Sequence, residues 1–191
     1  MPCGCRVGLL ATVGGMRHPT VPYLEALAGG AWWVVGAAAL STGPGTVILA
    51  AGLGVTAGLV VALRRRHGAG EPLPPGGRTK LLQCVIGAIV LVAIASTLLG
   101  MVSLGELAVP LACAITGGAL FPLSALLDDR SLLAAGGALL VLGAVGALLA
   151  LDSAGALYPQ GVVGMIAGLV LWITAAARTG LLAEAQGRVR R

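Results

Sequence analysis

Charged residues are scarce in this chain, and their scarcity decides its class. Only 10% of the 191 residues are Asp, Glu, Lys or Arg, whereas 58% are hydrophobic. A water-soluble domain carries about 25% charged residues. The composition therefore excludes an ordinary soluble domain and predicts a protein whose main partner is a lipid bilayer.

Asparagine, lysine and aromatic residues are also scarce. Asparagine is absent, eleven of the twelve cations are arginine, and aromatic residues make up 3% of the chain. This usage, together with the excess of Ala and Gly, is typical of a high-GC bacterial genome. The chain therefore has few aromatic side chains with which to form a pocket that binds a cation.

The familiar catalytic and metal-binding motifs are missing. The chain has no H-E-x-x-H motif, no G-x-S-x-G motif and no Walker loop. No ionisable residue falls at the centre of an apolar run, which argues against a proton pump. Cys3 and Cys5 form a lone C-x-C without further ligands, so we expect no metal and no cofactor.

Six apolar runs are each long enough to cross a bilayer. About 20 helical residues cross a hydrocarbon layer of about 30 Å, and such a run in lipid must satisfy its own backbone hydrogen bonds. The predicted fold is an all-α, polytopic transmembrane helical bundle of six spans. The expected spans are 23–40, 46–63, 81–99, 106–127, 132–151 and 161–177.

The Lys and Arg residues lie in every second connection between the expected spans and in the two termini. Segments 41–45, 100–105 and 152–160 contain no Lys or Arg, and all twelve cations fall in the other set of connections and termini. The positive-inside rule then places both termini in the cytoplasm and the chain in the bacterial inner membrane. The net charge of +5 is explained by this topology, so we expect no nucleic-acid partner.

The expected organisation has three parts. A cytoplasmic segment, 1–22, precedes a membrane domain, 23–177, which contains a cytoplasmic linker at 64–80; a basic cytoplasmic tail, 178–191, follows. The first fifteen residues lack the features of a cleavable signal peptide, and Met16 is an alternative start.

One face of the span at 23–40 combines a carboxylate with tryptophan. Glu25, Gly29, Trp32 and Gly36 fall within about 60° of one another on a helix, and Trp33 lies at the edge of this stripe. The first interpretation is a helix-start carboxylate with Trp32 filling the space above Gly29. The second is a cytoplasm-facing pocket in which Glu25 binds or protonates a ligand.

The span at 106–127 carries nearly all its unusual residues on one face. They are Glu106, Pro110, Cys113, Gly117, Phe121, Ser124 and Asp128. The stripe is consistent with the lining of a narrow pathway, or with an ordinary buried helix face that has acids at its ends.

Depth in the bilayer suggests a polar cluster in the inner leaflet. Its expected members are Glu25, Gln83, Ser124, Trp172 and Thr174. Arg178, at the inner end of the last span, is positioned to pair with Glu25 if the first and last spans are neighbours.

Glycines at small-xxx-small spacing predict close helix packing. Gly54 and Gly58 form one such pair, and Gly164 and Gly168 form another. These faces suit packing within the chain, a homo-oligomer or a membrane partner protein.

The sequence resembles small six-span bacterial membrane proteins that are functionally uncharacterised. The stretches "GAWWVVG", "GELAVPLACAITGGALFPLSALL" and "GMIAGLVLWITAAAR" carry the resemblance. It implies a six-helix membrane domain and no catalytic or ligand residues.

Three functional hypotheses remain. The first is a non-enzymatic component that handles or senses a small apolar or weakly polar molecule. The second is an intramembrane enzyme acting on a lipid or isoprenoid, with Glu25 or Glu106 as acid or base. The third is a structural subunit of a membrane complex.

Overall fold

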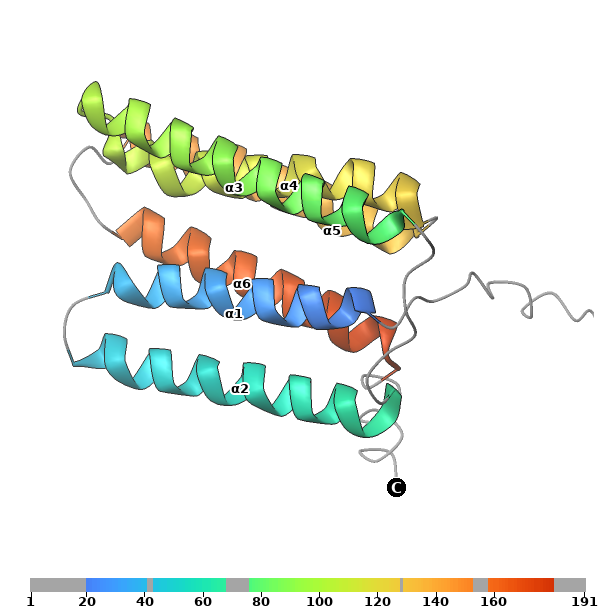
Figure 1. The fold of residues 1–191 in the computed structure, drawn as a ribbon. Coiled ribbons are helices and arrows are strands. Elements are labelled where there is room, and N and C mark those ends of the chain that lie inside the picture. The colour runs from blue at the N-terminus through green and yellow to red at the C-terminus, as the bar shows by residue number, and fades with distance from the viewer. Residues whose placement is uncertain (1–19, 41–42, 68–75, 128, 153–157, 181–191) are drawn as a thin grey trace, which may run out of the picture.

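The computed structural model describes residues 20–40, 43–67, 76–127, 129–152 and 158–180. Within these ranges the chain is helical apart from short turns (Figure 1). The elements are α1 (Thr20–Ala38), α2 (Pro44–His67), α3 (Gly77–Met101), the 3₁₀ turn η1 (Gly105–Leu107), α4 (Ala108–Leu127), α5 (Arg130–Asp152) and α6 (Tyr158–Arg178). The predicted all-α fold is confirmed.

Consecutive helices run in opposite directions, so the charged termini of the helices gather at one end (Figure 1). We call this end, where α2, α4 and α6 finish and α1, α3 and α5 begin, the arginine end. Its described arginines are Arg64, Arg65, Arg66, Arg78, Arg130 and Arg178. Which side of a membrane the arginine end faces stays a prediction.

Five of the six helices are long and apolar enough to span a membrane: α2, α3, α4 with η1, α5 and α6. The first helix, α1, is not among them. Its 19 residues include Glu25, two tryptophans and two adjacent glycines. The described residues thus contain six α-helices, and five of these qualify as spans by length and hydropathy.

The helices pack in the spatial order α3, α4, α5, α6, α1, α2 (Figure 1). The most extensive contacts join α1 to α6 and α4 to α5, while α2 covers α1 and α3 covers α4. Contacts of α6 with α5 and α4 join the two sets of three helices. In this order α1 and α3 do not pack extensively on one another, although both line a cavity that α4 also lines.

Glycines allow the two most extensive helix pairs to approach closely. A Cβ on Gly117 of α4 would lie 2.7 Å from the carbonyl oxygen of Gly136 in α5, and a Cβ on Gly164 of α6 would lie 2.7 Å from Gly36 of α1. Backbone therefore meets backbone at both crossings, as expected where small residues rather than bulky ones hold membrane helices together. Gly54 on α2 faces open space instead.

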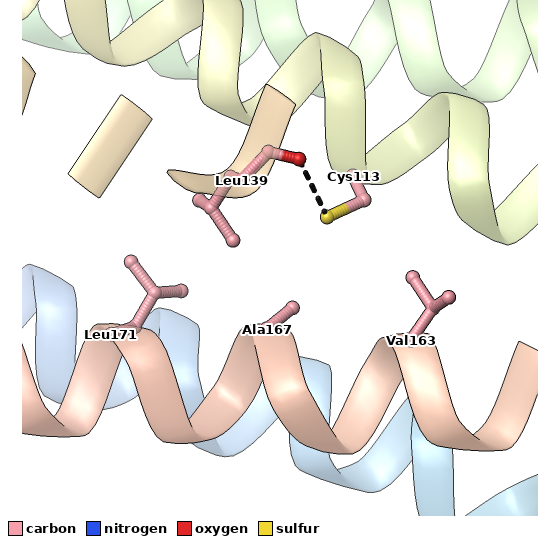
Figure 2. Close-up of a cluster of buried hydrophobic side chains, with 5 residues drawn as sticks. All are labelled: Cys113, Leu139, Val163, Ala167 and Leu171. Atoms are coloured by element: carbon pink, nitrogen blue, oxygen red, sulfur yellow. Dashed lines mark hydrogen bonds between the residues drawn. The ribbon is translucent and has the colours of Figure 1, made fainter. Parts of the chain in front are cut away.

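The two halves of the bundle meet in a small apolar core (Figure 2). Val163, Ala167 and Leu171 project from α6 toward Cys113 of α4 and Leu139 of α5. The thiol of Cys113 donates a hydrogen bond to the carbonyl oxygen of Leu139, at 3.4 Å. This core joins α4, α5 and α6, and Ala28 and Trp32 of α1 pack against it.

Candidate functional site

A cavity of about 820 Å³ lies between α1 on one side and α3 and α4 on the other. We call it the groove. Its lining is almost entirely apolar, and its polar side chains are Glu25, Cys84, Ser96 and Thr116. The volume falls within the range of about 300–1,000 Å³ that is usual for small-molecule sites.

The groove opens sideways, toward the face of the bundle that lipid would cover. Leu27 and Val35 on α1 and Ile89 on α3 line it, yet their exposed fractions are 55%, 43% and 63%. On α1 the lining runs from Leu24 to Val35, about 16 Å at 1.5 Å per residue. A molecule dissolved in the bilayer could therefore enter without passing through water.

One end of the groove is formed by a buried carboxylate that belongs to an ion-pair cluster. Glu25 is only 4% exposed, and its Oε1 accepts a hydrogen bond from Nη1 of Arg178 at 2.9 Å. Nη2 of the same guanidinium pairs with Oδ2 of Asp129. We call these three residues the ion-pair cluster. The pairing of Glu25 with Arg178, suggested from the sequence, is confirmed.

Asp129 is fixed in this cluster because it also caps α5. Its Oδ1 accepts hydrogen bonds from the backbone N–H and the hydroxyl of Ser131, at 2.9 and 2.8 Å, which is the usual N-cap arrangement. Partial burial alone would raise the pKa of Asp129, but the bonds from Ser131 and the charge of Arg178 hold that pKa below its usual value. Asp129 is thus an anion at neutral pH.

The second oxygen of Glu25 has no hydrogen-bond partner. Oε2 is buried and accepts no hydrogen bond from the described residues. Buried polar atoms in folded proteins are nearly always bonded to protein or water. An unsatisfied carboxylate oxygen on a residue that lines the groove is therefore the most unusual polar feature of the site.

The three tryptophans have different roles. Trp172 of α6 stacks on Trp33 of α1, with ring centroids 5.0 Å apart, and its indole N–H donates to the carbonyl oxygen of Ala26 at 3.3 Å. The indole of Trp172, not that of Trp32, occupies the space above Gly29. That part of the first interpretation of α1 is therefore wrong, and the tryptophan that lines the groove is Trp32.

Trp33 joins α1 to α2 as well as to α6. Its indole N–H donates to the carbonyl oxygen of Ile48 at 2.7 Å. A Cβ on Gly52 would lie 1.9 Å from the indole ring, so only glycine leaves room for it. Trp33 thus packs against two neighbouring helices.

The unusual face of α4 lies mainly against α5. Pro110 contacts Gly143 and Gly146 of α5, and Cys113 bonds to Leu139 as described above. Ser124 is buried, and its hydroxyl donates to the carbonyl oxygen of Phe121 in its own helix. This face of α4 is thus a helix-packing surface; the groove is bordered by a neighbouring face that includes Ala112, Thr116 and Ala119.

The remaining sequence-predicted residues lie apart from the ion-pair cluster. Gln83 is exposed on α3 and does not line the groove, although its neighbour Cys84 does. Thr174 donates to carbonyl oxygens of its own helix. Glu106 lies in η1, at the end of the bundle opposite Glu25, and Asp128 lies outside the described residues.

Sequence reasoning missed Asp129 and most of the groove lining. One signal for Asp129 was available, because a residue just after the fourth span must lie at the same surface as the end of the sixth. No comparable signal identifies Thr116 or Ala112, since they become lining residues only through the positions of α1 and α3. Among the residues that the structure describes, no group of His, Cys, Asp and Glu is arranged to hold a metal ion.

Antiparallel apolar helices, five of them of membrane-spanning character, define a multi-pass membrane protein. Comparison of the chain with protein-family models, curated proteins and solved structures finds no match. No family is therefore identified, and the function has to be argued from the groove and the ion-pair cluster.

Proposed function

We propose that the groove binds a small, largely apolar molecule taken up from the bilayer, and that the protein handles or senses this molecule without chemically changing it. The observation that carries the proposal is the groove itself, an apolar cavity of about 820 Å³ that is lined by exposed side chains of α1 and α3 on its lipid side. Atoms that line an unfilled apolar cavity lack van der Waals partners on one side, and a hydrocarbon ligand supplies those contacts.

The spacing of the polar groups favours binding over catalysis. Mechanisms that use a paired general acid and base place both groups within hydrogen-bond reach of the same substrate. Glu25 is the single carboxylate in the described lining, and Glu106 lies at the opposite end of the bundle. The hydroxyl of Thr116 already donates to a carbonyl oxygen of its own helix, at 2.8 Å.

The proposal can be tested with a long-chain alkane that carries a photoreactive diazirine. The protein would be reconstituted in phosphatidylcholine nanodiscs, irradiated with the probe and mapped by mass spectrometry. We expect labelling of groove residues such as Val92 and Ala112 that saturates and that excess unlabelled alkane suppresses. Labelling spread evenly over exposed positions such as Val141 and Leu148, without saturation, would contradict the proposal.

A matched pair of variants locates the binding. Ala31 lines the groove and is exposed there, so Ala31→Phe places a ring in the cavity without displacing a buried neighbour. Overfilling a packed site typically costs about 1–3 kcal/mol, so the saturable labelling should weaken by about tenfold or more. Ala138→Phe, at an exposed position of α5 outside the lining, should leave the labelling unchanged.

A further inference from the structure

The charges around the head of the groove do not balance. The ion-pair cluster contains two carboxylates, Glu25 and Asp129, and one guanidinium, Arg178. No other charged side chain is among the described residues that line the groove. When the Glu25 carboxyl is ionised, a ligand group placed beside it therefore meets an excess of negative charge.

The hydrogen bonds are unbalanced in the same direction. Oε1 of Glu25 is held by Arg178, whereas the buried Oε2 has no donor. Leaving a buried acceptor unsatisfied is costly, and because Glu25 lines the groove, an N–H or O–H donor bound there would satisfy this oxygen. In its ionised form, Glu25 therefore favours a hydrogen-bond donor over an acceptor at this end of the groove.

These two imbalances together select among head groups. A carboxylate or phosphate would be repelled by Glu25, and the guanidinium of Arg178 is already engaged by both carboxylates. A hydroxyl would supply the donor but not the charge. A protonated amine supplies both, and charge-assisted hydrogen bonds are about twice as strong as neutral ones.

The aromatic content of the groove narrows the choice further. A quaternary ammonium has no N–H and is usually recognised by a cage of aromatic faces. Trp32 is the aromatic residue in the lining, and its backbone lies about 10 Å beyond Glu25 along α1 at 1.5 Å per residue. The ring of Trp32 is therefore suited to contact a hydrocarbon chain, while Glu25 is suited to an ammonium that bears hydrogen.

We propose that the ligand is an amphiphilic ammonium with at least one N–H, which donates to Oε2 of Glu25 while its alkyl chain fills the groove. The inference depends on the proposed function, because it names the chemical class of the molecule that the groove takes. It assigns Glu25 to the head group, and Ala28, Ala31 and Trp32 to the first part of the chain. Arg178 and Asp129 act through Glu25 as positioning residues.

The test compares four amphiphiles that share one chain and differ in the head group. Dodecylamine, dodecyltrimethylammonium, dodecanol and dodecanoate would each compete with the photoreactive alkane in phosphatidylcholine nanodiscs, at matched membrane concentrations. We expect dodecylamine to compete at a concentration about tenfold lower than dodecanol or the trimethyl compound, since a hydrogen bond to a charged group is worth about one decade in affinity. Dodecanoate should be the weakest competitor.

Two variants separate a role of Glu25 from a general effect of charge. Glu25→Gln should abolish the preference for dodecylamine and leave alkane labelling in place, whereas Glu106→Gln, at the opposite end of the bundle, should leave the preference intact. Equal competition by all four compounds on the unmodified protein would overturn the inference while the groove remained a binding site. Absence of saturable alkane labelling would instead overturn the proposed function, so the two failures are distinguishable.

Discussion

At the residue scale, the arginine end depends on Arg178. Its side chain is 10% exposed and contacts Glu25 from α1 and Asp129 from the start of α5. It therefore joins three segments that are far apart in the sequence. Buried ion pairs of this kind contribute little net stability compared with apolar packing, but removing one partner leaves the other charge buried and alone.

We predict that Arg178→Met strongly destabilises the protein. The expected loss is about 3–5 kcal/mol, because Glu25 is 4% exposed and would lose its counter-charge. Glu25→Gln should cost less, since Arg178 keeps Asp129. The free energy of unfolding in detergent micelles, measured by denaturant titration, checks both variants.

Arg130→Met provides the matched control. Arg130 lies at the same end of the bundle but is exposed, so its replacement should change the free energy of unfolding by no more than about 0.5 kcal/mol. If Arg178→Met and Arg130→Met had equal effects, the ion-pair cluster would have no special structural role.

At the residue scale the sequence predicted part of the site. It placed Glu25 and Arg178 at the same membrane surface, because six crossings, an even number, separate the start of the first span from the end of the sixth. It did not predict that Asp129 completes the cluster or that Oε2 of Glu25 is left without a donor. Those facts depend on side-chain rotation about each helix axis, which depth alone does not fix.

At the element scale, the pairing of α4 with α5 rests on glycine. Gly117 and Gly136 face one another so closely that a Cβ on either would lie within 3 Å of a carbonyl oxygen across the interface. The neighbouring Gly118 has nothing within 4 Å of the position where its Cβ would be. Adjacent glycines in one helix therefore offer a matched pair for mutation.

We predict opposite effects for alanine at these two positions. Gly117→Ala should destabilise by about 1–3 kcal/mol, because backbone atoms cannot move aside as a flexible side chain can. Gly118→Ala should be neutral or stabilising by up to about 1 kcal/mol, because alanine is the better helix former. Thermal unfolding of both variants in the same detergent tests the pair, and equal stability would contradict this account of the interface.

The spacing of unusual residues correctly picked out one face of α4 as distinctive. What it could not supply was the identity of the neighbour. Proline, cysteine and glycine suit a tight helix crossing and a narrow pathway equally well, because both need small side chains and tolerate a displaced backbone. Contact with Gly143 and Leu139 of α5 distinguishes the two.

At the scale of the whole molecule, the bundle is an open series of helices. The order from α3 through α4, α5, α6 and α1 to α2 leaves α1 and α3 on either side of the groove. Exposed large apolar side chains cover much of the outside, and α3 has no buried residue in its described length. Such a surface is expected to be covered by lipid.

We predict that the arginine end faces the cytoplasm. After the native cysteines are replaced, Thr79→Cys at the start of α3 should react with a membrane-impermeant maleimide only once cells are permeabilised. Thr46→Cys, at the opposite end, should react in intact cells; both positions are exposed. The reverse labelling pattern would overturn the orientation that the positive-inside rule gives.

The sequence by itself determined the class of the protein, the number and approximate limits of the helices, and the gathering of the arginines at one end. These properties follow from chain composition and from alternation of direction, since each apolar run must form its own backbone hydrogen bonds. The tertiary structure alone decided that α1 packs on α6, that α4 packs on α5 and that a groove lies between α1 and α3. Helix order and rotation arise from side-chain packing between segments distant in sequence, and only that packing places the unsatisfied oxygen of Glu25 at the end of an apolar cavity.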